Sequence, residues 1–445
     1  MLGISFLNKP KNFHVEVGGL EFMDYQNGDL FRDLVSYFDT DLVNQDDKWY
    51  FKDRERAAEA LQVIFMKHTG ILLDLQTADS VPNAAVDAGW FSPGNVINIK
   101  GIDEYLSASQ TNIGMAFKAL KTDVLKGWVD TSTGKVGGDF SKISFRLYIN
   151  HYINLFIRHK FIERYKTTMS EALASILIHE CGHVFSGFLH VYRAIVDPLV
   201  STTAIKLIVD GKAYGKQRVE IIKEAFKILE VGQPVKESDV ADLTSDQIVI
   251  YFNKAINTRD TRRTLSLGTL DRSSEIYADL YSIRMGCGKA LVAALASLPS
   301  GSLIYGGMTL GWTYIALLGW LAVNPILMVM GAFCSLIYLV SFFSDKLLPN
   351  DMYDSRYRRL KTILRDYIVQ INDNNSIDKR DKVKMLADAK EIEKIVEDAK
   401  PMLEGTAVQR FFGWICNGND YRAQELENYS DELLGHTLSL YKDSF

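Results

Sequence analysis

The chain contains little cysteine, and none of it occurs in pairs. Its 445 residues include 4 cysteines, which lie far apart at Cys181, Cys287, Cys334 and Cys416. Small secreted domains held together by disulfides carry a much denser cysteine framework, and structural zinc sites normally use Cys-x-x-Cys pairs. The spacing therefore argues against both classes and predicts reduced thiols in a cytosolic compartment.

The chain also lacks an excess of basic residues. It has 50 Lys and Arg against 55 Asp and Glu, and the two signs are mixed along the sequence. Nucleic-acid binding requires a basic face or stripe, so we expect no nucleic-acid partner. The length allows two or three domains with at least one large hydrophobic core.

One segment of the chain lacks charged residues altogether. Residues 290–344 contain no Asp, Glu, Lys, Arg or His. Leu303–Val323 and Ile326–Phe343 each approach the roughly 20 apolar residues that cross a bilayer, and Asn324-Pro325 separates them. We expect residues 290–344 to form an apolar, transmembrane helical hairpin. Burial inside a large protein core or at an oligomer interface is the alternative.

Basic residues flank this apolar block on both sides. By the positive-inside rule both flanks and the soluble parts would be cytoplasmic, which makes the protein membrane-associated. If the block is buried in protein instead, the chain would be cytoplasmic or part of a larger assembly. The flanking residues are Arg284, Lys289, Lys346, Arg356, Arg358, Arg359 and Lys361.

The remaining chain separates into a mixed part and helical regions, so the expected fold class is α+β and predominantly helical. Residues 1–102 combine a helical pattern at 53–68 with short strand patterns at 71–75 and 96–100. Residues 103–289 are interpreted as a helical core, in which the aromatic-rich segment 143–164 favours a helix over a strand. Residues 345–445 are predicted to be a C-terminal helical region.

The strongest motif is the run His179-Glu180-Cys181-Gly182-His183. Residues four apart lie on one face of a helix, so His179 and His183 can bind one zinc ion. Catalytic zinc keeps one position open for a water of lowered pKa, and Glu180 can take that proton as general base. The alternatives are two helix-face histidines without metal, or a relic site that has lost activity.

Zinc needs a third ligand, for which Glu275 is the best candidate. Asp279 follows one helical turn later and can hydrogen-bond a ligand histidine, which fixes the orientation of its ring. The alternative is a pair of solvated acids on a helix surface. His190 lies one position out of register with the metzincin pattern HExxHxxGxxH, so it is interpreted as an ordinary surface histidine.

These two motifs together resemble the M48-type gluzincins, a divergent match to a family of membrane-associated zinc metallopeptidases with the pattern HExxH…ExxAD. A weaker similarity covers Asn83-Ala84 and Pro93–Ile99. The resemblance implies a zincin-like metallopeptidase domain in which His179, His183 and Glu275 bind Zn²⁺ and Glu180 is catalytic. It also implies that strand 96–100 is the edge strand of the active site and holds substrate by β-augmentation.

The spacing departs from the family, since about 80 residues separate strand 96–100 from the zinc helix and indicate a helical insertion. The expected function is a membrane-tethered, zinc-dependent endopeptidase that acts on protein or peptide substrates. The alternative is a structural or assembly component, for example of a virion or membrane complex, built on a metallopeptidase fold and inactive. Tyr277, Tyr281 and Arg284 lie near enough to be considered as oxyanion stabilisers, and none is predicted to act as one.

Overall fold

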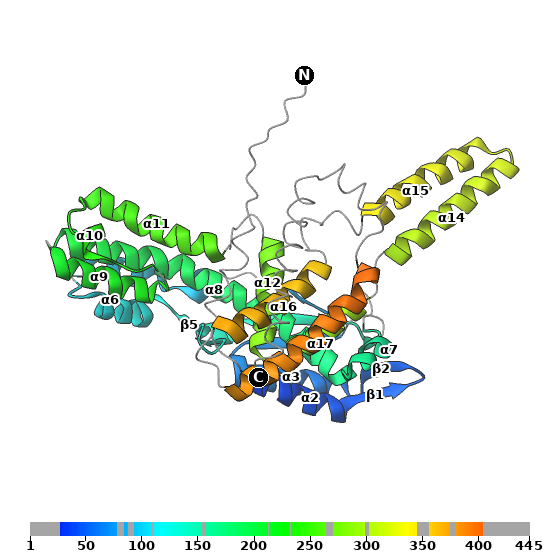
Figure 1. The fold of residues 1–445 in the computed structure, drawn as a ribbon, viewed down its shortest axis with the longest axis horizontal. Coiled ribbons are helices and arrows are strands. Elements are labelled where there is room, and N and C mark those ends of the chain that lie inside the picture. The colour runs from blue at the N-terminus through cyan, green and yellow to red at the C-terminus, as the bar shows by residue number, and fades with distance from the viewer. Residues whose placement is uncertain are drawn as a thin grey trace, which may run out of the picture.

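The computed structural model describes residues 27–77, 84–87, 93–108, 110–153, 157–211, 213–231, 233–263, 270–298, 302–344, 356–373 and 379–403. Within these ranges helices predominate and the strands form three small sheets (Figure 1). The predicted predominantly helical fold class is therefore confirmed. Of the predicted C-terminal region, residues 404–445 lie outside the described part of the chain.

The N-terminal part begins with helix α2 (Asp29–Asp41), the hairpin β1 (Leu42–Gln45) and β2 (Lys48–Phe51), and helix α3 (Arg54–Thr69). The Asp53 side chain accepts two backbone N–H bonds at the start of α3, and Gly70 ends the helix in the left-handed conformation. Strand β3 (Leu72–Thr77) follows. The helix predicted at 53–68 and the strand predicted at 71–75 are thus confirmed.

The central sheet has the order β3-β7-β4, with β4 (Ala84–Asp87) at its edge. Strand β7 (Ser144–Ile149) runs parallel to β3 and antiparallel to β4. The helix preferred for 143–164 is wrong over this strand. Phe145, Leu147 and Ile149 are buried while the residues between them are more exposed, which is the two-residue period of a half-buried strand.

The strand predicted at 96–100 is also wrong. Residues Pro93–Val96 form the short helix α4, Ile97 makes one isolated bridge to Leu125, and α5 begins at Ile99. The bonds from Asn98 N–H to Val124 O and from Lys126 N–H to Val96 O form this single bridge, and the helices on either side of Ile97 and Asn98 prevent a longer ladder. The edge strand β4 contacts the predicted zinc helix, and its Val86 N–H bonds to Glu180.

Helix α8 (Met169–Val209) carries the His179–His183 motif and runs through the whole molecule. Its N-cap is Thr168, which forms a capping box with Glu171. At 1.5 Å per residue the helix is about 60 Å long. Its first half packs into the main core as far as Leu189, and its second half, from Val196, packs into a separate core.

This second core is a helical unit at one end of the molecule (Figure 1). Within this unit the buried side chain of Arg218 donates hydrogen bonds to four backbone carbonyl oxygens. The elements of the unit are the second half of α8, α5 (Ile99–Ser107), α6 (Ile113–Ala119), the π-helix η1 (Leu120–Val124), α9 (Gly215–Ile228), α10 (Glu237–Val240) and α11 (Ser245–Arg263). The remaining short elements belong to the main core, which buries Val136, Phe140, Ile162 and Tyr165. They are β5 (Gly127–Asp130), β6 (Lys135–Gly138), η2 (Asp139–Lys142), α7 (His159–Ile162) and η4 (Glu163–Tyr165).

Helix α12 (Leu270–Arg284) packs against α8 and is followed by α13 (Gly288–Ser297), α16 (Arg356–Asp373) and α17 (Lys379–Leu403). Gly286 has a φ of +79°, and it separates α13 from α12. Helix α16 ends at Asp373. Helices α16 and α17 return to the main core, so the C-terminal helices complete it.

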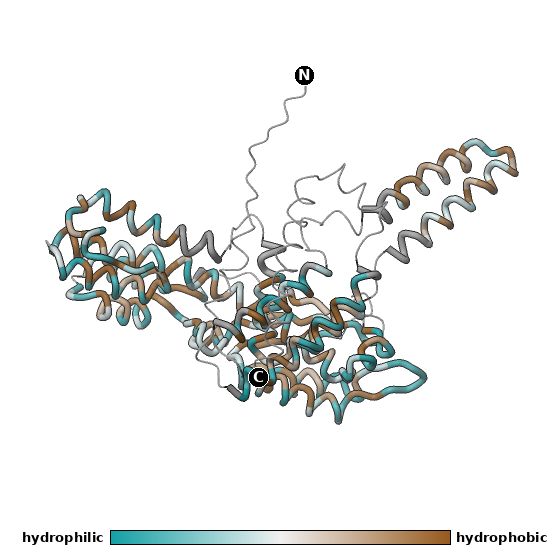
Figure 2. The backbone as a smooth tube through the Cα atoms, in the orientation of Figure 1, coloured by the Kyte–Doolittle hydropathy of each residue, from teal (hydrophilic) through white to brown (hydrophobic). Residues whose placement is uncertain are grey.

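Helices α14 (Ser302–Leu321) and α15 (Pro325–Ser344) form the predicted hairpin, which projects away from the rest of the protein (Figure 1). They approach closely at Gly319 and Gly331, and Thr313 and Ser335 share a hydrogen bond of 2.7 Å. Hydrophobic residues line both helices (Figure 2). Leu310, Val323 and Ile326 are 73%, 87% and 76% exposed, so the hairpin presents apolar side chains to its surroundings.

Among the described residues, the helix that is both long and apolar enough to cross a membrane is α8. Most of its apolar stretch is buried inside the structure, as in the core helix of a soluble protein. Two of the basic residues that flank the hairpin in sequence are also buried, Arg284 and Arg359. These two arginines therefore do not contribute to a charged border of a membrane segment.

Candidate metal centre

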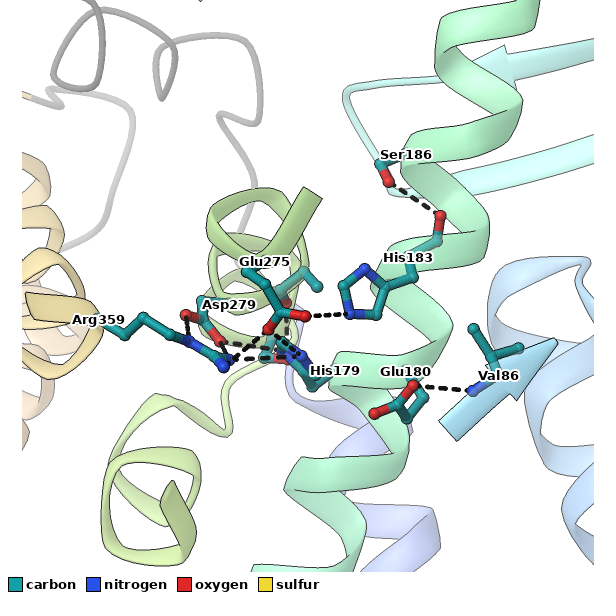
Figure 3. Close-up of polar contacts among 10 residues, drawn as sticks. Val86, His179, Glu180, His183, Ser186, Glu275, Asp279 and Arg359 are labelled. Atoms are coloured by element: carbon teal, nitrogen blue, oxygen red, sulfur yellow. Dashed lines mark hydrogen bonds and ion pairs between the residues drawn. The ribbon is translucent and has the colours of Figure 1, made fainter. Parts of the chain in front are cut away.

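Close packing of α8 against α12 brings the two predicted motifs together. A Cβ atom on Gly182 would lie 2.8 Å from Ala278 Cα, so the helices can approach this closely only because position 182 is glycine. His179 and His183 face α12 from one side, and Glu275 and Asp279 face α8 from the other (Figure 3). The structure therefore assembles the predicted ligand set from two segments that are far apart in the sequence.

The side-chain nitrogens of both histidines lie next to the Glu275 carboxylate. His179 Nε2 is 3.3 Å from Glu275 Oε2, and His183 Nε2 is 3.4 Å from Glu275 Oε1. Both distances are longer than a good N–H···O hydrogen bond. His179 and Glu275 are each 6% exposed, so these groups meet in a nearly dry environment.

Each of these two spacings is close to the separation of two ligand atoms on one zinc ion, and the two histidines face different oxygens of Glu275. Ligand atoms about 2.0–2.1 Å from a tetrahedral ion are about 3.3–3.4 Å from one another. The buried Oε2 of Glu275 also makes no hydrogen bond of acceptable geometry, although Arg359 Nη1 lies 2.7 Å away. Two imidazoles and one carboxylate are a donor set that catalytic zinc uses, so the chemistry of the residues present fits the implied metal.

Glu180 belongs to the same cluster but points in another direction. Possible ligand atoms of His179, Glu180 and His183 all lie within 4.8 Å of one another, the one such group of these residue types among the described residues. Glu180 Oε2 accepts a hydrogen bond of 3.0 Å from the backbone N–H of Val86 on β4 (Figure 3). Because this bond turns Glu180 towards the sheet, Glu275 has the better position for the third ligand.

Asp279 occupies the supporting position predicted for it. Its Oδ1 lies 2.9 Å from His179 Nδ1, which leaves Nε2 of the same ring directed at Glu275. A carboxylate behind a metal-binding histidine fixes the ring and makes its other nitrogen a stronger ligand. Asp279 is only 2% exposed and is therefore not the solvated surface acid of the alternative interpretation.

Arg359 of α16 is the site residue that the sequence did not reveal. Its Nε and Nη2 donate to the two oxygens of Asp279 at 2.9 and 2.7 Å, and Nη1 pairs with Glu275. In the sequence Arg359 was one of several basic residues near the hairpin. Its position in the charged, helical segment after the hairpin carried no signal that would connect it with Glu275, because the contact depends on the return of α16 to the core.

Burial and neighbouring charges shift the pKa values of the site in opposite directions. Burial lowers the pKa of His179, but Asp279 and Glu275 outweigh it and raise that pKa to about 9. Burial raises the pKa of Glu275, but Arg359 and both histidines hold it well below its usual range. Burial raises the pKa of Glu180, as suits a group that must accept a proton.

The considered oxyanion residues are engaged elsewhere. Tyr281 is buried and its hydroxyl donates to the Gly134 carbonyl oxygen at 3.0 Å. Arg284 is fully buried and forms a two-point ion pair with Asp366 of α16. Tyr277 is only 5% exposed, inside the main core. His190 follows His183 by about two turns of α8 and is not part of the ligand cluster.

Comparisons with known proteins identify no relative of this chain. No protein-family model matches it, and neither a curated protein nor a solved structure does.

Proposed function

We propose that the protein is a zinc-dependent endopeptidase of the gluzincin type. The observation that carries the proposal is the meeting of His179 Nε2 and His183 Nε2 with the two oxygens of Glu275 at 3.3 and 3.4 Å, inside a buried site. The resemblance of HExxH…ExxAD to the M48-type peptidases and the close packing of α8 against α12 support it.

His179, His183 and Glu275 would hold Zn²⁺, which lowers the pKa of bound water and polarises a peptide carbonyl. Glu180 lies beside them on α8 and accepts the proton of the attacking water. Asp279 holds the His179 ring through Nδ1, and Arg359 holds both Asp279 and Glu275. The chain's own residues thus orient the proposed ligands before substrate arrives.

A peptide substrate would add to the free edge of β4. Among the described strands, β4 pairs with β7 on one side only, and Val86 on its other side contacts Glu180. An extended peptide that pairs with this edge would place its backbone next to the metal ligands. This assigns to 84–87 the role expected for 96–100.

We also propose that the α14–α15 hairpin tethers the enzyme to a membrane. Each helix has 20 residues, which is about 30 Å and matches the hydrocarbon core of a bilayer. The large exposed apolar side chains of the hairpin support lipid as their surroundings.

Cleavage of fluorescently labelled casein by the zinc-loaded chain in detergent tests the proposed activity. We expect wild type to cleave it and Glu180→Gln to lose at least about 100-fold in rate with its zinc retained, because Gln cannot accept the proton. Wild type that carries one zinc and leaves casein and a mixed peptide library intact would contradict the peptidase. It would favour the assembly component instead.

A further inference from the structure

The backbone N–H of Val86 is directed at the proposed general base rather than at the sheet. It donates to Glu180 Oε2 at 3.0 Å, while Val86 stands opposite Leu147 in the β4–β7 pairing (Figure 3). Antiparallel strands alternate between residues that exchange ladder bonds and residues that do not. Val86 is therefore a residue whose N–H the ladder leaves for another acceptor.

This bond fixes a side chain that would otherwise have several rotamers. Glu180 is half-buried between β4 and the two histidines, and the Val86 bond holds one of its two oxygens. The other oxygen is then held in one place beside the metal ligands. A proton acceptor that is fixed in this way reacts without first losing conformational freedom.

We propose that the Val86 N–H is a positioning group for peptide hydrolysis, which holds Oε2 of Glu180 so that the second oxygen takes the proton from water. This inference rests on the proposed function. The Val86 side chain takes no part, because only its backbone reaches Glu180. A substrate strand that pairs with β4 finds this N–H occupied and must use the Val86 carbonyl and the backbone groups of Ala84, two residues away on the same edge.

Replacement by proline tests the bond directly, because proline lacks the N–H. Proline is tolerated on an edge strand where the N–H does not serve the ladder, and Ala85 before it already has extended backbone. The matched control is Val86→Ala, which shortens the same side chain and keeps the N–H. Zinc content and the thermal unfolding midpoint show whether each variant keeps the site and the fold.

With labelled casein as the probe, we expect Val86→Pro to lower kcat by about 10- to 100-fold, as for loss of a hydrogen bond to a charged group. KM should change less than about threefold, zinc content should stay at the wild-type value, and the kcat of Val86→Pro should lie at least about tenfold below that of Val86→Ala. Val86→Pro with wild-type kcat overturns the inference. A raised KM with unchanged kcat also overturns it, because the N–H would then bind substrate.

Hydrogen exchange of the β4 amides tests the same contact without any cleavage. Glu180→Ala removes the acceptor, so we expect the Val86 amide to exchange at least about tenfold faster while the Ala85 and Asp87 amides keep their rates. Unchanged exchange at Val86 overturns the inference. Wild type that binds zinc and cleaves nothing contradicts the proposed function and this positioning role together, whereas active Val86→Pro contradicts the positioning role alone.

Discussion

Arg359 is the residue that most changes the picture of the site obtained from the sequence. Its guanidinium lies between two buried carboxylates, Glu275 and Asp279, and neutralises charge that burial alone would make costly. It contacts the proposed ligands Glu275 and His179 directly and holds Asp279 behind them. Arg359 is thus a positioning residue for the proposed zinc site.

Removal of this guanidinium should destabilise the metal-free protein more than the zinc-bound protein. Arg359→Ala leaves two buried carboxylates without their cation, which typically costs about 3–5 kcal/mol. Zinc supplies positive charge to Glu275, so the fall in the unfolding midpoint should be larger after chelation than with zinc. Arg359→Lys keeps the charge but loses the two-point contact with Asp279. Its unfolding midpoint should therefore lie between those of wild type and Arg359→Ala. Equal falls with and without zinc would contradict this account.

Gly182 sets the distance between the two halves of the site. Gly182→Ala would push a Cβ atom to 2.8 Å from Ala278 Cα and 3.1 Å from Tyr281 Cβ. We expect a loss of about 1–3 kcal/mol in unfolding free energy and weaker zinc binding, measured by denaturation and metal titration. Gly311→Ala on α14 is the matched control, since its Cβ would meet nothing within 4 Å. Wild-type unfolding free energy and zinc binding in Gly182→Ala would show that the helices are not in this close contact.

At the scale of elements, helices with clear capping or turn residues at their ends can be predicted from the sequence, whereas short strands cannot. Asp53 and Gly70 mark both ends of α3, and Asn324-Pro325 marks the turn of the hairpin. Strand β7 was mistaken for a helix because aromatic and apolar residues in a short run fit either period. The segment 96–100 alternates like a strand, yet α4 ends at Val96 and α5 begins at Ile99, so the pairing with Leu125 is limited to Ile97.

The hairpin can be tested as an element in its own right. Leu310→Arg with Val329→Arg places charge on two strongly exposed apolar positions of α14 and α15, each costing about 2.5–3.5 kcal/mol in a bilayer. Wild type should float with phosphatidylcholine vesicles in a density gradient, and the double variant should stay at the bottom. Ile250→Arg, at an exposed apolar position of α11, should still float. Flotation of the double variant would contradict membrane insertion.

At the scale of the whole molecule, the site joins segments that lie on both sides of the hairpin in sequence. His179 and Glu275 precede it, and Arg359 follows it. The HExxH and ExxAD residues could be predicted because their spacing is local to one helix each. Their meeting, and the contributions of β4 and α16, depend on tertiary packing that no local pattern encodes.

This arrangement makes the hairpin an insertion that the rest of the fold does not need. A chain with residues 302–344 replaced by a Gly/Ser linker should stay folded, remain soluble without detergent and bind zinc, since α13 and α16 belong to the main core. A chain that ends at residue 344 should fail to bind zinc. It would lose Arg359 and leave the fully buried Arg284 without Asp366. Zinc binding by the truncated chain would contradict the role of α16.

The most direct measurement is the zinc content of the purified full chain beside that of two variants. The account predicts one zinc per chain in wild type, a loss of most zinc in Glu275→Ala, and wild-type content in His190→Ala. His190 lies on the same helix as the ligands but outside their cluster, so it controls for loss of a histidine. Unchanged zinc in Glu275→Ala, or none in wild type, would contradict the proposed centre.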